Sequence, residues 1–376
     1  MKTLTRAWVD GPLQRLLGLR HPIVLGPFGG GASSVALTSA VANAGGLGSF
    51  GAHALTPDAI RSLVEELRAS TSGAFAVNLW VPQPGEGDLR LSDEEFTRHV
   101  DRLRPYLTEL DLPEPMHTNS FARDYQAQVQ ALLESRPPAI SFVMGIPDGA
   151  IISAAKRDGI VTIGTASTVE EAVALESAGI DVIVASGSDA GGHRGAFLRP
   201  VQESLVGTFS LVPQVVDAVA VPVVAAGGIA DARGVVAALA LGADGVQVGT
   251  AFLGTHESGA SAVHKHALHS EQARTTVLTR VFSGRLARAI PNRFQREMTA
   301  FEDDVPPYPV QNALTANLRK VANERGVPDL VHLWAGQAAS LTSARPAAEL
   351  YAQLTSETER LLGLARINDS GAAGGY

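Results

Sequence analysis

The sequence contains no cysteine, and it contains no run of lysine and arginine that would form a basic stripe. The first absence excludes disulfides, thiolate nucleophiles and metal sites with cysteine ligands. The second, together with a net charge of −8, makes nucleic acid and anionic membranes poor candidates for partners. Any chemistry must therefore depend on other side chains or on a bound cofactor.

Long apolar runs are also missing, since none approaches the roughly 20 residues that a membrane-spanning helix needs. Residues 1–20 are interrupted by charged side chains and by Gly11-Pro12. They lack the apolar stretch and the small-residue cleavage site of a secretory signal. These absences predict a cytoplasmic protein with no membrane partner.

What is present suits a large buried core, because 45% of the 376 residues are hydrophobic and only 18% are charged. Eight short apolar runs alternate with helical patterns, and strands that are apolar on both faces are typical of a buried parallel sheet. The pattern predicts an α/β fold, a (βα)8 TIM-type barrel. A doubly wound open sheet is the rival, but "GPFGGGASS" (26–34) does not match the GxGxxG turn expected there. The runs cover residues 22–28, 47–52, 75–81, 139–145, 160–166, 181–187, 221–228 and 245–252.

Local capping signals mark two of the intervening helices. Thr56 is a natural N-cap, followed by Pro57 at the first helical position. Ser167 with Glu170 three residues later forms a capping-box pattern for a helix that ends at Gly179. Both helices begin directly after a predicted strand, as the βα repeat requires.

Three regions divide the chain. We expect residues 1–253 to form the barrel, with a helical excursion over 83–135, and residues 254–345 to form a mostly helical lid or substrate subdomain. A last helix over 344–365 is expected to return to the barrel, so that 346–376 comprises that helix and a frayed tail. Long excursions on βα loops often shape the mouth of an active site.

Glycine-containing turns follow the last two predicted strands. In a barrel, phosphate groups often bind at the loops after strands seven and eight, where backbone N–H groups can approach an anion. Gly227-Gly228 and Gly249-Thr250 occupy these places, and their occurrence together favours phosphate binding. The alternative for either pair is a tight connection between strand and helix.

His193 stands a few residues past the sixth strand, within "SDAGGHRGAF" (188–197). The neighbouring glycines allow the backbone to pass close to a flat ligand, and a neutral imidazole suits proton transfer near pH 7. The alternative is a loop histidine that only makes a hydrogen bond.

Several segments together resemble the nitronate monooxygenases, formerly called 2-nitropropane dioxygenases: "PIVLGPFGGG", "FAVNLWVP", "VIVASGSDAGGHRG", "VPVVAAGGIAD", "GADGVQVGTAFL" and "TRVFSGRLARAIPNRF". The matches are collinear from about residue 20 to about residue 300, and "YPVQNALT" and "LWAGQ" extend them. The resemblance implies an FMN-dependent barrel enzyme. Such an enzyme oxidises alkyl nitronates, such as propionate 3-nitronate, with O₂ to a carbonyl compound and nitrite or nitrate.

The resemblance also implies roles for individual residues. His193 matches the family's catalytic histidine, and Asn78 would bond the polar edge of the flavin ring. Tyr308 and His53 are expected in the substrate pocket, where His53 replaces a tyrosine-containing turn. Ser186 stands where the family usually has glutamine, which weakens one expected flavin contact. The implied FMN-binding residues are Gly26, Pro27, Phe28, Asn78, Ser186, Gly191, Gly192, Gly227, Gly228, Gln247, Val248, Gly249 and Thr250.

Other readings of the same barrel stay open. His193 is either a base toward a neutral nitroalkane or an imidazolium that holds the nitronate oxygens. Alternative functions are an FMN-dependent NAD(P)H reductase of a quinone or enoyl thioester, a flavin-free scaffold, and an aldolase or isomerase. An aldolase or isomerase would need a lysine or paired carboxylates at the strand ends, and the eight apolar runs lack them there. The oligomeric state is open, a homodimer included.

The remaining polar clusters are expected to be structural. His264, His266 and His269 predict a solvated helix face rather than a metal site, because i, i+2 spacing points side chains apart. Glu302–Asp304 is expected in an exposed loop, Trp80 and Trp334 mainly in packing. Surface ion pairs are the expectation for three arginines near the family motifs: Arg285, Arg288 and Arg293.

Overall fold

The computed structural model describes residues 2–86, 89–117 and 124–364, and its centre is one parallel sheet of eight strands. A bridge between Val24 and Leu47 brings its two end strands together and closes the sheet into a barrel. Each of the eight apolar runs contributes one strand, so the predicted TIM-type barrel is confirmed. In spatial order the strands are β1 (Ile23–Leu25), β9 (Gly245–Val248), β8 (Val223–Ala226), β6 (Val182–Ser186), β5 (Val161–Ala166), β4 (Ala139–Val143), β3 (Phe75–Trp80) and β2 (Gly48–Gly51).

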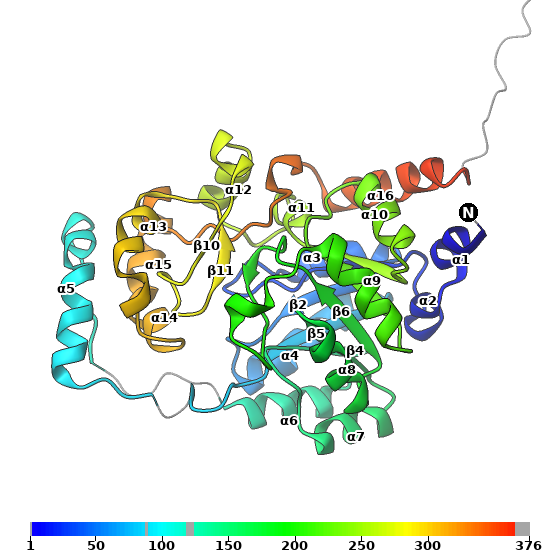
Figure 1. The fold of residues 1–376 in the computed structure, drawn as a ribbon, viewed down its shortest axis with the longest axis horizontal. Coiled ribbons are helices and arrows are strands. Elements are labelled where there is room, and N and C mark those ends of the chain that lie inside the picture. The colour runs from blue at the N-terminus through cyan, green and yellow to red at the C-terminus, as the bar shows by residue number, and fades with distance from the viewer. Residues whose placement is uncertain (1, 87–88, 118–123, 365–376) are drawn as a thin grey trace, which may run out of the picture.

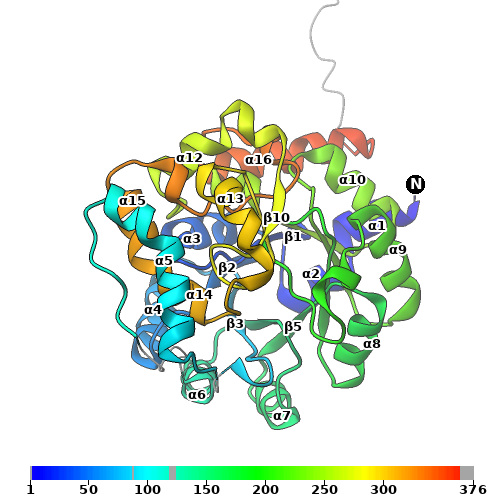
Figure 2. The same ribbon diagram turned by 60° about the vertical axis from the view of Figure 1, so that its left-hand side comes forward.

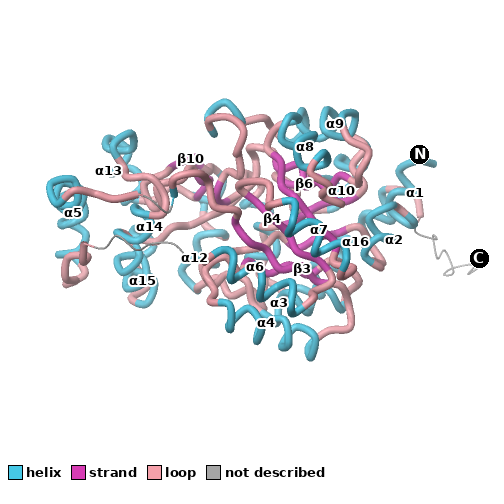
Figure 3. The backbone as a smooth tube through the Cα atoms, turned by 90° about the horizontal axis from the view of Figure 1, so that it is seen from below, coloured by secondary structure: helices cyan, strands magenta, loops and turns pink. Residues whose placement is uncertain are grey.

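Helices cover the outside of this barrel, and Figure 3 shows cyan helices on both sides of the magenta strands. Alternate strand residues point outward, and Ile23, Val77 and Val246 pack with the helices in the main core. The surrounding helices are α3 (Val35–Asn43), α4 (Pro57–Ser70), α6 (Tyr125–Ser135), α7 (Gly149–Arg157), α8 (Val169–Ser177), α9 (Thr208–Ala218), α10 (Ala232–Ala240) and α16 (Ala347–Leu361). The return of the last helix to the barrel is confirmed, since Leu350 and Leu354 of α16 are buried in this core.

The N-terminal helices α1 (Lys2–Asp10) and α2 (Pro12–Leu17) pack at the end of the barrel where the strands begin. Leu13 and Leu17 join the inward-facing Val24, Ala76 and Val224 in a separate buried cluster. This apolar cluster fills the barrel at the amino-terminal ends of the strands, so the barrel is open at their carboxyl ends. Among the described residues, no helix has both the length and the apolar character needed to cross a bilayer.

The predicted N-cap is confirmed for α4, whereas for α8 it lies one residue later than predicted. The Thr56 hydroxyl accepts a hydrogen bond from Ala59 N–H, as predicted. The N-cap of α8 is Thr168, not Ser167, and its hydroxyl accepts from Glu171 N–H. The Glu171 carboxylate, fully buried, accepts from the backbone of Ser167 and of Phe197, and so ties α8 to the segment after His193.

The excursion divides between two cores. Its second helix, α6, packs on α4 of the barrel, whereas α5 (Asp93–Glu109) joins the C-terminal region in a second core. Figures 1 and 2 show α5 beside the C-terminal helices, at the opposite end from α1. The other elements near this end are α11 (Thr250–Leu253), α12 (Ala262–Leu268), α13 (Arg293–Met298), α14 (Val310–Leu314), α15 (Ala316–Glu324), β10 (Val277–Thr279) and β11 (Ala287–Ala289). Short 3₁₀ helices cover Val201–Ser204, Glu271–Arg274, Thr299–Asp304, Pro328–Leu330 and Ala339–Leu341.

The prediction that 254–345 is mostly helical missed a small antiparallel sheet. Its strand order is β10, β11 and β7 (Gly192–His193), with His193 opposite Ala287. His193 therefore lies on a strand that pairs with the C-terminal region, not in an unpaired loop. The frayed C-terminal tail expected at 368–376 lies outside the described residues.

The second core predicts a local loss of stability. Phe294 is fully buried between Tyr106 of α5 and Phe282, with ring centroids 4.8 Å and 5.0 Å away. Phe294→Ala should cost about 3–5 kcal/mol of unfolding free energy, because it leaves a cavity among aromatic rings. Denaturant unfolding measures the loss, and limited proteolysis should cleave α5 before the barrel. Phe209→Ala, at a side chain 74% exposed, is the control and should cost little; equal losses would contradict the assignment.

Candidate active site

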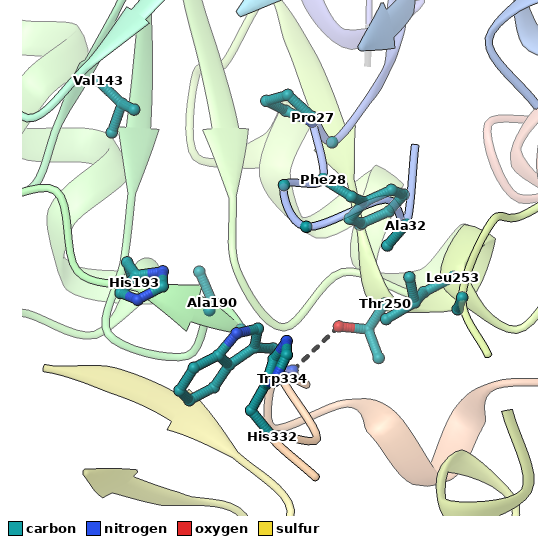
Figure 4. Close-up of a pocket in the computed structure, with 18 of the residues that line it drawn as sticks. Pro27, Phe28, Ala32, Val143, Ala190, His193, Thr250, Leu253, His332 and Trp334 are labelled. Carbon is teal, nitrogen blue, oxygen red and sulfur yellow. Dashed lines mark hydrogen bonds between the residues drawn. The ribbon is translucent and has the colours of Figure 1, made fainter. Parts of the chain in front are cut away.

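A single cavity of about 610 Å³ opens at the carboxyl ends of the strands, between the barrel and the C-terminal region. Figure 4 shows Pro27 and Phe28 on one side of it, His193 on another, and His332 and Trp334 on a third. Most of the residues singled out in the sequence line this one cavity: Gly26, Pro27, Phe28, His53, Asn78, Ser186, Gly191, Gly192, His193, Gly227, Gly228, Gln247, Gly249, Thr250 and Tyr308. The tertiary fold brings them together from seven different strand ends and loops.

Val248 is the exception among the expected flavin contacts. Its side chain is fully buried in the core between strands and helices and is absent from the cavity wall. The reason is the two-residue period of a strand: Gln247 faces inward, so its neighbours Val246 and Val248 face outward. The Val248 carbonyl accepts a hydrogen bond from Gly26 N–H, which joins the ends of β1 and β9.

The glycine-containing turns after the last two strands present free backbone donors. Gly227 and Gly228 have φ of +107° and +72°, which favours glycine. Within the described chain, the N–H groups of Gly228, Gly249 and Thr250 have no protein acceptor, and a Cβ on Gly249 would meet only Phe28, at 3.7 Å. Such a row of unpaired amides suits a phosphate group.

Gly191 is small for a different reason. A Cβ there would lie 2.4 Å from the backbone nitrogen of Gly336, so the glycine lets the 335–337 segment approach the loop before His193. Gly336 N–H also donates to Thr250 Oγ1 at 3.0 Å, the dashed line of Figure 4. The C-terminal segment is thereby fastened to both sides of the cavity.

His193 is held by a hydrogen bond of 2.9 Å between its Nε2 and Ser283 Oγ. Because the Ser283 hydroxyl donates to the Arg285 carbonyl at 3.1 Å, its oxygen is left to accept Nε2–H. That arrangement leaves the imidazole lone pair on Nδ1. Burial, with smaller contributions from His53 and Arg319, lowers the pKa of His193 to about 3, so the ring is neutral near pH 7.

Aromatic rings surround this imidazole. Trp80 lies edge-on to His193 with centroids 5.0 Å apart, and Trp334 is 5.1 Å away. His53 stacks on Trp80 with ring centroids 4.0 Å apart, and its Nδ1 is buried with no partner in the described residues. Burial lowers the pKa of His53 to about 4. Both tryptophans therefore line the cavity as well as packing.

Surface ion pairs were the wrong expectation for two of the three arginines. Arg285 is nearly buried, pairs with Glu86 of the excursion, and lies over the Tyr308 ring at 4.8 Å. Arg288 is buried and donates to the Ser188 carbonyl at 2.8 Å. Arg293 does form a partly exposed pair with Glu109, at 2.6 Å.

The histidine cluster on α12 also needs correction. His264 is buried, not solvated: its Nε2 lies 2.9 Å from the Trp334 carbonyl, and burial lowers its pKa to about 4. His266 is exposed, as expected. In the ranges that the structure describes, no group of three histidine or acidic side chains could hold a metal ion. Asp304 of the acidic 302–304 segment pairs with Arg102 and Arg98 at the surface.

The sequence did not reveal two cavity residues of the C-terminal region, Arg319 and His332, or Ser283, which bonds His193 from outside the cavity lining. One signal was available for Arg319. Ala316, Arg319, Lys320 and Asn323 follow the i, i+3, i+4, i+7 spacing of one helix face, and all four line the cavity. The spacing shows that they share a face but not what covers it.

Comparison with known proteins gives a consistent result. The nitronate monooxygenase family model matches residues 11–357. A probable nitronate monooxygenase of Staphylococcus aureus (strain Newman) is 39% identical over 356 residues, which cover 94% of this chain and 99% of that protein. The solved nitroalkane oxidase of Streptomyces ansochromogenes is 38% identical with a TM-score of 0.85, covering 94% of this chain and 99% of its own.

A more distant solved structure, FabK of Thermotoga maritima, has 28% identity and a TM-score of 0.74, covering 94% of this chain and 98% of its own. All of these likenesses extend through both the barrel and the C-terminal region. The chain belongs to the nitronate monooxygenase family of flavin-dependent oxidoreductases.

Proposed function

We propose that this protein uses FMN and O₂ to oxidise alkyl nitronates, and nitroalkanes after deprotonation, to a carbonyl compound and nitrite or nitrate. The observation that carries the proposal is the position of a neutral imidazole, His193, in the same cavity as a row of unpaired backbone amides. The likeness to nitroalkane oxidase of Streptomyces ansochromogenes supports the substrate class.

The residues present fit FMN. Gly228, Gly249 and Thr250 offer N–H donors without protein acceptors, which suit the terminal phosphate. Gly26, Pro27 and Phe28 line one wall for the ring system, and Asn78, Ser186 and Gln247 supply polar groups on the barrel side. The Asn78 amide donates to Ser141 Oγ at 3.0 Å, which fixes its orientation. FMN held by these residues would supply the redox chemistry, as an electron acceptor that O₂ can reoxidise.

The protein groups then have distinct tasks. His193 removes a proton from the carbon of a neutral nitroalkane, with Nδ1 as the accepting atom and Ser283 holding the opposite nitrogen. Trp80, Trp334 and Tyr308 form an apolar wall that excludes bulk water from the developing anion. The low pKa of His193 means that the ring meets the substrate as a neutral imidazole and not as an imidazolium. The nitronate anion that forms beside it offsets the cost of protonating the ring.

Replacing His193 tests the assignment directly. His193→Asn should lower turnover of a neutral nitroalkane by about 10²–10⁴-fold, the usual contribution of a general base, while the flavin stays bound. Steady-state rates and visible flavin absorbance measure the two effects. His266→Asn, at an exposed histidine, is the matched control. Normal turnover by the His193 variant would refute its role.

Stopped-flow mixing without O₂ separates the proposed oxidation from the reductase alternative. Propionate 3-nitronate should bleach the flavin of the wild-type protein rapidly, because the nitronate is the electron donor. NADPH, mixed separately, should bleach it slowly or not at all. Rapid bleaching by NADPH together with none by the nitronate would replace the proposal by the reductase.

The pH dependence follows from the buried histidines. Since the pKa of His193 is about 3 and that of His53 about 4, both are already in the basic form at higher pH. With a neutral nitroalkane, kcat/KM should therefore stay flat between about pH 5 and pH 8 and fall only in more acidic solution. A histidine-like break near pH 6.5, with activity lost as pH rises, would instead indicate a required imidazolium.

Ser283 should act as a positioning residue. Ser283→Ala removes the acceptor that orients His193 and should slow deprotonation by about 10- to 100-fold, by analogy with the loss of partners that orient metal-bound histidines. Ser283→Thr keeps the hydroxyl and should restore most of the rate. A loss that is the same for both variants would show that the hydroxyl does not orient the base.

A further inference from the structure

One guanidinium on the cavity wall is engaged with two neighbouring polar side chains. Arg319 of α15 is partly buried, and its Nη2 donates to the carbonyl and to Oδ1 of Asn312, both at 2.8 Å. Its Nη1 lies 3.2 Å from Nδ1 of His332. Asn312 belongs to α14, whereas His332 follows the 3₁₀ helix Pro328–Leu330, and both side chains line the cavity. Neither of them has a task in the deprotonation described above.

The contact with Arg319 determines which nitrogen of His332 carries the proton. A guanidinium has only N–H donors, so Nδ1 of His332 accepts from Arg319 and the proton of the neutral ring is on Nε2. Burial, together with the charge of Arg319, lowers the pKa of His332 well below its usual value, which keeps the ring neutral. A Cβ on Gly30 would lie 3.9 Å from Nε2, so this nitrogen faces the loop after β1, another part of the cavity wall. Within the residues that the structure describes, Nε2 has no hydrogen-bond partner.

The same guanidinium orients the amide of Asn312. Because Nη2 of Arg319 is a donor, it binds the amide oxygen, and the two N–H groups on Nδ2 of Asn312 remain available. No group of the described chain accepts a hydrogen bond from Nδ2. Arg319 therefore orients two neutral donors on the cavity wall, His332 Nε2–H and Asn312 Nδ2–H, and leaves both without a protein acceptor.

We propose that His332 and Asn312 bind the two oxygens of the substrate's nitro group and stabilise the negative charge that develops there. The inference rests on the proposed function and adds an oxyanion site to it, with Arg319 as the positioning residue. As the C–H bond breaks, the proton passes to Nδ1 of His193 and the electron pair forms a C=N bond, which moves charge onto the nitro oxygens. Donors already in place at those oxygens stabilise the transition state more than the neutral substrate.

The spacing of the rings agrees with this arrangement. His193 and His332 have ring centroids 5.1 Å and 5.3 Å from that of Trp334, so the two imidazoles are no farther apart than these two steps together (Figure 4). A carbon in position to react lies about 3–3.5 Å from the base, and a nitro oxygen accepts from an N–H group at about 2.9 Å. With the C–N and N–O bonds between these contacts, one substrate can contact both histidines. The donors assigned to the flavin phosphate lie on the loops after β8 and β9, away from α14 and α15.

The kinetic test uses 1-nitropropane and, separately, its preformed nitronate. His332→Phe keeps a ring but removes the donor, and Asn312→Asp keeps the oxygen that Arg319 binds but replaces the amide donor by a second oxygen. With 1-nitropropane, each variant should lower kcat and kcat/KM together by about 100-fold, as the loss of one oxyanion donor does. With the nitronate, each variant should mainly raise KM, because the charge is already present when that substrate binds.

Further variants separate hydrogen-bond donation from a structural role. His332→Gln places an amide near the position of Nε2 and should recover part of the lost rate, whereas His266→Phe, at an exposed histidine, should behave as the wild type does. Arg319→Met leaves both donors present but unoriented, and it should show the same difference between the two substrates. Equal losses of kcat on both substrates in His332→Phe and Asn312→Asp, or loss of the flavin absorbance from both, would overturn the proposal.

Binding of a carboxylate gives a readout that does not depend on turnover. Butyrate has the heavy-atom skeleton of 1-nitropropane and a planar pair of anionic oxygens. It should raise the melting temperature of the FMN-loaded wild-type protein and of His266→Phe, but not of His332→Phe or Asn312→Asp, and neutral butyramide should have a smaller effect. No shift in the wild-type protein, or equal shifts in all four proteins, would contradict the oxyanion site.

Failure of the proposed function gives a different result. If the wild-type protein oxidises neither 1-nitropropane nor its nitronate, but butyrate stabilises it and the two donor variants abolish that effect, the nitronate chemistry is wrong and the oxyanion site stands. If both substrates are oxidised with rate constants that His332→Phe and Asn312→Asp do not change, the proposed function stands and the oxyanion site is wrong.

Discussion

The pairing of two short backbone segments is the constraint on which the site depends. β7, which carries His193, is the edge of a sheet whose other strands belong to the C-terminal region, and Arg194 N–H continues that contact to the Leu286 carbonyl at 2.9 Å. On the barrel side, the buried Arg194 side chain donates to the carbonyls of Ser186 and Gly187. The imidazole is thus held between the barrel and the C-terminal region, and both regions are needed to form its surroundings.

Burial then determines the protonation of the site. Desolvation penalises the charged form of each group, which keeps His193, His53, His264 and His332 neutral, but it lowers the pKa of Arg319 only to about 10. The same dry surroundings therefore contain neutral bases and a persistent cation. A cavity of this kind suits a substrate that enters as or becomes an anion, since electrostatic attraction is stronger away from water.

The excursion after β3 supports residues around the cavity from outside and also joins the second core. Gln83 donates to the carbonyls of Met144 and Ala196, and Glu86 pairs with Arg285 beside Tyr308. α5 then continues into the core of the C-terminal region. A segment that interrupts the βα repeat in the sequence thereby links the barrel to the region that covers its open end.

The sequence by itself determined the eight strands, their barrel and the common location of the glycine turns and His193, because these depend on local periodicity and on the rule that parallel strands end on one side. The alternation of side chains along a strand is also a local property, and it explains why Val248 faces away from the cavity. Only the tertiary structure decided what covers each polar side chain. Arg285 and His264 were expected at the surface, yet segments distant in sequence pack against them: Arg285 pairs with Glu86, and His264 is buried beside the Trp334 carbonyl. Burial depends on contacts between segments that are distant in the sequence. The protonation states of the site are therefore determined only when the C-terminal region packs against the barrel.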